Sequence, residues 1–87
     1  MKFHKGHNGK RRTMRRILAQ VNHINEYGGT ASDRYDAILE LSFKAHIMIT
    51  PVPQDDELWT QAKKIRDILT NLSWQSERNH ALYLVYG

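Results

Sequence analysis

Apolar residues recur every three or four positions along three stretches of this chain, and this spacing is the feature that most constrains the fold. At about 100° per residue, the apolar residues of the first stretch fall on one side of a helix. They are Met14, Ile17, Leu18, Val21 and Ile24. Because such a helix must bury its apolar side against a neighbour, the pattern predicts a small helical domain.

A glycine pair ends the first predicted helix. Asn8 is a suitable capping residue before the apolar pattern begins, and we expect the helix to run to about Tyr27. Gly28 and Gly29 follow at once, and glycine readily adopts the left-handed conformation that closes helix ends.

Two prolines separate the second predicted helix from the third. The second is expected to begin near Thr30, whose hydroxyl is a capping group, with Ser32 as a competing cap, and to reach about Met48 or Ile49. Pro51 and Pro53 end it, because proline lacks an amide hydrogen and disfavours a helical residue before it. The third is expected over about residues 54–72, and its first turn is rich in carboxylates.

The end of the chain is compatible with two interpretations. Ser73 is a possible cap for a fourth helix, whereas residues 82–86 are equally suited to a short strand. The only suitable partner for that strand is residues 46–50. We predict a mainly α protein, a compact bundle of about four short helices. The alternative is a helical domain with one two-stranded β pair.

Positive charge is concentrated at the N-terminus. Seven of the thirteen Lys and Arg residues lie within residues 1–16, the first acid is Glu26, and the net charge is +4. Residues 1–9 combine charge with two glycines and few apolar side chains, so we expect a flexible basic arm there. Residues 10–87 are expected to form a single helical domain.

Composition excludes several classes of protein. There is no cysteine, so the chain has neither disulfides nor Cys-based zinc sites. No apolar run approaches the ~20 residues that span a bilayer, and we expect a soluble, cytoplasmic protein without a membrane partner. No phosphate-binding loop, set of metal ligands or catalytic constellation is recognisable. We therefore predict a non-enzymatic protein with no cofactor, no metal and no catalytic residue.

The basic stretch that leads into the first helix is the principal candidate site. Phosphate affinity comes from Lys and Arg displacing condensed counterions, and the arginine fork suits phosphate and carboxylate equally. The expected partner is therefore nucleic acid or an acidic protein surface. The candidate residues are Lys10, Arg11, Arg12, Arg15 and Arg16.

A second candidate site lies on the third predicted helix. Trp59 is outside the apolar stripe and close on the helix to Lys63 and Arg66, a combination that is enriched at protein interfaces. The favoured function is binding to nucleic-acid phosphates through the basic arm and first helix. The alternative is a small inhibitor or adaptor that docks on a larger protein, such as a nucleic-acid-handling machine, and blocks a working surface. The oligomeric state is left open.

Overall fold

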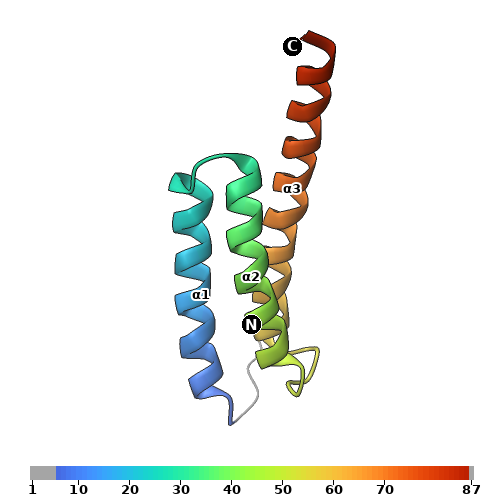
Figure 1. Cartoon of the computed structure of the whole chain (residues 1–87). Helices are drawn as coiled ribbons and strands as arrows, with labels where there is room; N and C mark the ends of the chain where they lie inside the picture. The colour runs from blue at the N-terminus through green and yellow to red at the C-terminus, as the bar shows by residue number, and fades with distance from the viewer. Residues whose placement is uncertain (1–5, 87) are drawn as a thin grey trace.

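Three helices pack side by side, and consecutive helices run in opposite directions (Figure 1). The computed structural model describes residues 6–86, with side chains for residues 6–75. The helices are α1 (Asn8–Tyr27), α2 (Ala31–Ile49) and α3 (Glu57–Tyr86). Each helix contacts the other two, and the contact between α2 and α3 is the most extensive. Over the described part of the chain, none of the helices has the length and hydrophobicity needed to cross a membrane.

The start of α1 differs from the prediction. Asn8 lies inside the helix rather than at its cap, and its side-chain oxygen accepts a 2.9 Å hydrogen bond from Nη1 of Arg11. The capping position is held by His7, whose side chain makes no capping bond. The predicted arm, residues 1–9, therefore overlaps the helix at Asn8 and Gly9, and its first five residues lie outside the described part of the chain.

The turn between α1 and α2 follows the predicted local signals. Gly28 donates its amide to the carbonyl of Ile24, and Gly29 has a φ of +92°, which a residue with a Cβ adopts only with strain. Thr30 then caps α2, because its hydroxyl accepts a 3.1 Å hydrogen bond from the amide of Asp33. These contacts confirm the predicted end of the first helix and the predicted start of the second.

The third helix begins later and ends later than predicted. Residues 54–56 form a turn, and α3 starts at Glu57, where the buried Asp56 accepts a 2.9 Å hydrogen bond from the amide of Leu58. The helix then passes Ser73 without a break and continues to Tyr86. No glycine or proline occurs between Glu57 and Tyr86, so nothing in the backbone interrupts it.

Two predictions about the fold are therefore wrong. The described residues form three helices rather than four, because the predicted third and fourth helices are parts of α3. The alternative with a β pair also fails: residues 46–49 belong to α2, residues 82–86 belong to α3, and the described residues contain no strand.

The core runs along the centre of the bundle and is built from the predicted stripes. Met14, Ile17 and Val21 of α1 are buried, while Leu18 and Ile24 are half-buried against them. The other buried apolar residues are Ala31, Ile38, Ala45, Ile49, Val52, Leu58, Ala62, Ile65, Leu69 and Leu72. The apolar residues that recur every three or four positions on α3 are thus all buried: Leu58, Ala62, Ile65, Leu69 and Leu72.

Truncation of a central core residue tests this packing. Ile38 and Ile65 are fully buried, so Ile38→Ala and Ile65→Ala should each lower the free energy of unfolding by about 2–4 kcal/mol. Arg12→Ala, at an exposed position, should change it by less than about 0.5 kcal/mol. Urea unfolding followed by circular dichroism measures all three. Equal losses in the core variants and in Arg12→Ala would contradict the assigned core.

The cap of α3 can be tested separately. Asp56→Ala should cost about 1–2 kcal/mol of stability because it removes the acceptor for the amide of Leu58. Asp56→Asn keeps an acceptor oxygen and should cost less. The exposed Asp67, inside α3, provides a control that removes the same charge without removing a cap. If Asp67→Ala and Asp56→Ala had the same effect in urea unfolding, charge rather than capping would be responsible.

Candidate functional site

The basic residues of α1 are concentrated in the first turns of the helix. Arg12, Arg15 and Arg16 are exposed, and the first turn contains no acid. None of these three guanidinium groups forms an ion pair with a described residue. Their charge is therefore available to an external anion.

A polar hollow of about 430 Å³ lies between α1 and α3 beside these residues. Its lining comprises Asn8, Arg11, Arg12 and Arg15 of α1 and Gln61 of α3. The α1 residues are three or four positions apart and so lie on one side of the helix, while Gln61 closes the hollow from α3. The third helix thus converts a basic helix face into a concave site, which the periodicity of α1 alone does not reveal.

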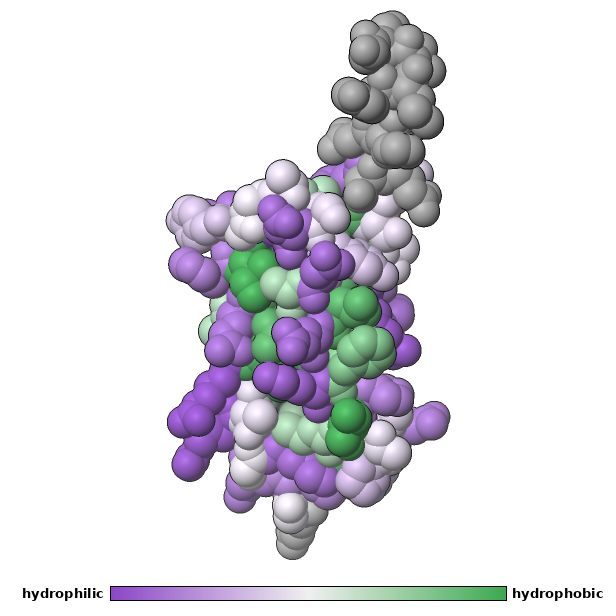
Figure 2. Space-filling view, viewed as in Figure 1, coloured by the Kyte–Doolittle hydropathy of each residue, from purple (hydrophilic) through white to green (hydrophobic). Residues whose placement is uncertain are grey.

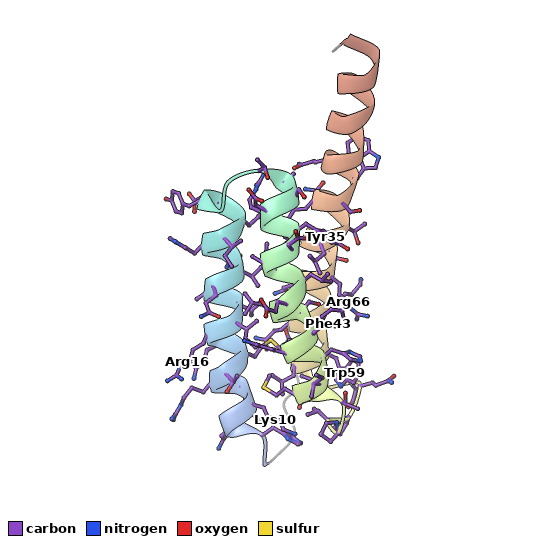
Figure 3. All side chains as sticks on the ribbon, in the orientation of Figure 1. Lys10, Arg16, Tyr35, Phe43, Trp59 and Arg66 are labelled. Atoms are coloured by element: carbon purple, nitrogen blue, oxygen red, sulfur yellow. The ribbon has the colours of Figure 1, made fainter. Side chains whose placement is uncertain are left out.

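The structure separates the five predicted basic residues. Arg11, Arg12 and Arg15 share the hollow, whereas Lys10 and Arg16 are not part of its lining. Figure 3 shows Arg16 pointing away from the bundle and Lys10 on the opposite side of α1. Of the five predicted basic residues, three therefore share a hollow and two lie outside its lining.

Polar groups in and near the hollow are incompletely hydrogen-bonded. Oε1 of Gln61 is buried and makes no hydrogen bond within the described residues, and the same holds for Nδ1 of His7 at the start of α1. His7 also provides no side-chain cap, so first-turn amides of α1 are not satisfied by a capping side chain. The helix dipole favours an anion at this end of α1, in the same region as the arginines.

The side chains that line this hollow are chemically suited to anions. A guanidinium group can donate two parallel hydrogen bonds to a phosphate or carboxylate, and three arginines share the hollow. No group of three or more His, Cys, Asp or Glu side chains that could hold a metal ion occurs in the described part of the chain.

The predicted interface residues of α3 do lie together. Trp59, Lys63 and Arg66 line a second hollow, of about 360 Å³, together with Gln54 and Thr60. Lys63 and Arg66 are exposed, and neither makes an ion pair with a described residue. The predicted clustering of an aromatic ring with two cations is present on this side of α3.

Trp59 is held firmly by its own chain. Its indole Nε1 donates a 2.8 Å hydrogen bond to the carbonyl of Val52 in the α2–α3 connection. The ring meets His46 of α2 edge-on, with the ring centroids 6.1 Å apart. Trp59 is consequently half-buried, so much of its surface is already used to join the connection, α2 and α3.

Two exposed apolar residues were not identified from the sequence. Phe43 is 61% exposed and Ile47 is 73% exposed, four positions apart on α2. Figure 2 shows hydrophobic patches on this face on either side of a hydrophilic strip. The sequence signal for them is that apolar residues occupy a larger part of the circumference of α2 than its two neighbouring helices can cover.

No protein-family model matches this chain, and neither does any curated protein or solved structure. Inference about its function must therefore begin from the side chains described above. The three-arginine hollow and the exposed apolar pair are two features with a chemical preference.

Replacement of Trp59 should separate its structural role from binding. Trp59→Phe keeps an aromatic ring but leaves the carbonyl of Val52 without the indole donor, so stability should fall by about 1 kcal/mol. Binding of an oligonucleotide should be unchanged, because Trp59 does not line the hollow between α1 and α3. Urea unfolding and fluorescence anisotropy measure the two effects. A stability equal to wild type would mean that the hydrogen bond to Val52 contributes nothing.

Proposed function

We propose that this protein is a small non-enzymatic binding protein that holds nucleic-acid phosphates with Arg11, Arg12 and Arg15 of α1. The observation that carries the proposal is that these arginines share one polar hollow at the uncapped start of a helix. Arg12 and Arg15 are exposed, and exposed cations release counterions from a polyphosphate when they bind it; this release supplies most of the non-specific affinity. Arg16 and Lys10 add positive potential from either side of the hollow.

The expected recognition is of the backbone rather than of base sequence. Contacts to phosphate set the position of a protein on nucleic acid but carry no sequence information. Base readout needs side chains directed together at base edges, and the hollow contains only one amide on each of its two helices. We therefore expect similar affinity for different sequences of equal length.

An acidic protein surface is the competing partner for the same arginines, because carboxylates also accept bidentate bonds from guanidinium. The lining of the hollow favours phosphate. Every residue in it is polar, and protein interfaces depend on a buried aromatic or aliphatic anchor that this hollow does not offer. The alternative function, a small inhibitor or adaptor docked on a larger protein, would have to use another surface of the bundle.

The salt dependence of oligonucleotide binding tests this proposal. If three phosphates are neutralised, the logarithm of affinity should fall with the logarithm of salt concentration at a slope of about −2.7 for a duplex and about −2 for a single strand. Arg12→Ala and Arg15→Ala should each flatten the slope by about one unit. Labelled single strands and duplexes, titrated from ~50 mM salt upward and followed by anisotropy, provide the measurement.

Lys63→Ala is the matched control, because it removes one positive charge from a different surface of the bundle. It should leave the slope unchanged. Lys10→Ala should have a smaller effect than Arg12→Ala, since Lys10 does not line the hollow. Absence of detectable binding at ~50 mM salt, where phosphate binding is strongest, would refute the proposal. Equal losses in Lys63→Ala and Arg12→Ala would show that net charge, and not this hollow, binds the strand.

A further inference from the structure

An apolar groove of about 480 Å³ lies between α1 and α2, apart from the proposed phosphate site. Figure 2 shows hydrophobic surface over this part of the two helices. The groove is lined from both helices, by Ala19, Gln20, His23 and Ile24 of α1 and by Ala37, Glu40 and Leu41 of α2. The described residues leave it open to solvent.

The side chains of this groove suit the approach of another helix. Ile24, Ala37 and Leu41 are half-buried, so part of each apolar side chain still faces the groove. Ala19 and Ala37, one on each helix, have only a methyl group as side chain. Small residues let a neighbouring helix pack at a short interaxial distance.

The C-terminal end of α3 extends beyond the bundle. Leu72 is the last buried apolar residue among residues 6–75, and Trp74 is already 59% exposed. The helix nevertheless continues to Tyr86, and Figure 1 shows it running past the ends of α1 and α2 with no described helix beside it. We call residues 73–86 the C-terminal extension. It contributes to the elongated shape of the molecule, 54 × 21 × 20 Å.

The composition of the C-terminal extension favours contact with another apolar surface. Residues 81–86 read Ala-Leu-Tyr-Leu-Val-Tyr and contain no charged residue. A helix that is apolar on every side is normally buried. Short helices are marginally stable in water on their own, and most of their stability in proteins comes from packing.

We propose that the C-terminal extension of one copy of this chain docks in the groove between α1 and α2 of a second copy, and that the exchange is reciprocal. Within one molecule, the continuous α3 helix carries the extension away from the groove. A two-fold axis across the ends of two bundles places each extension alongside the other bundle. The assembly is then closed, because both grooves and both extensions are used.

The C-terminal extension is long enough to reach this groove in a second copy. As a helix, residues 73–86 span about 21 Å. The groove lies near the same end of the bundle, because Ala19 is about 12 Å from the end of α1 at Tyr27. The extension can therefore cover the whole groove while the two bundles stay about 9 Å apart.

Charge favours a neutral occupant of the groove. Glu40 lines it and Asp36 is exposed one helical turn earlier, so both an acidic helix and a phosphate backbone would be repelled. Residues 17–43 contain four acids and one arginine. The C-terminal extension carries one Glu and one Arg, at positions 77 and 78, and their charges cancel. An apolar segment without net charge meets no such repulsion.

The proposed arrangement also keeps the basic ends of two copies apart. Seven of the thirteen Lys and Arg residues lie within residues 1–16, whereas the groove lies in the second half of α1. The two bundles meet at the ends opposite to these cations, so repulsion between the two basic ends is weakened by distance and by salt. The inference goes beyond the proposed function: the dimer would present its two arginine hollows far apart, at its outer ends.

Sedimentation velocity of the full chain over a range of concentrations tests the proposal, and the wild type should form a dimer. Ala19→Glu puts a charge in the groove, and the double substitution Leu82→Lys with Val85→Lys puts charges in the C-terminal extension. Each variant should weaken dimerisation at least about tenfold. Ala19 is exposed, and lysine near a helix C-terminus is favourable, so both variants should keep the wild-type circular dichroism spectrum.

Phe43→Ser is the matched control, because it removes an exposed apolar side chain that lies outside the groove. This variant should dimerise like the wild type. A short oligonucleotide should bind Ala19→Glu with the wild-type salt slope, since Ala19 does not line the arginine hollow. Failure of the dimer is thus distinguishable from failure of the phosphate site.

A mixture of the two variants distinguishes exchange between copies from docking within one chain. A mixed dimer contains one unaltered groove that holds one unaltered extension, and its other contact brings the new glutamate toward the new lysines. The mixture should therefore form more dimer than either variant alone. Docking of each extension in the groove of its own chain would give no such recovery.

Three results would overturn the proposal. The first is a wild type that sediments as a monomer at every concentration. The second is a dimer that persists in Ala19→Glu or in the double lysine variant, or that is lost in Phe43→Ser, because another surface would then join the copies. The third is a mixture of the two variants that forms no more dimer than each variant does alone.

Discussion

The burial of one face of α3 against both other helices is the constraint on which the rest of the structure depends. Leu58, Ile65 and Leu72 lie two helical turns apart and are almost completely removed from water. Each buried side chain of this size contributes about 1.5–3 kcal/mol relative to an exposed one. Because α3 contacts α1 on one side and α2 on the other, the same packing sets the positions of both candidate surfaces.

The two sides of α3 support different chemistry. On the side of α1, Gln61 closes a hollow lined by polar residues, three of them arginines, and these side chains are chemically suited to anions. On the side of α2, Lys63 and Arg66 line a hollow together with the half-buried Trp59. The packing of α3 therefore holds these two surfaces in fixed relative positions.

The candidate site was predictable only in part. The basic stretch was visible in the sequence because seven of the cations are clustered near the N-terminus, and the spacing of Trp59, Lys63 and Arg66 correctly placed them together. Only three of the five predicted basic residues line one hollow, because α3 lies beside those three and closes the hollow. Likewise, the indole of Trp59 donates a hydrogen bond to the carbonyl of Val52 only because of the path that the α2–α3 connection takes.

The sequence by itself determined the helical class, the stripes that became the core and the turn at Gly28 and Gly29. Such signals act within a few residues, through backbone conformation and local hydrogen bonds, so they can be recognised without a structure. Only the tertiary structure decided that α3 continues past Ser73 and that Phe43 and Ile47 remain uncovered. The reason is that a serine allows both a cap and a continuing helix, and an apolar side chain is buried only where another helix lies against it.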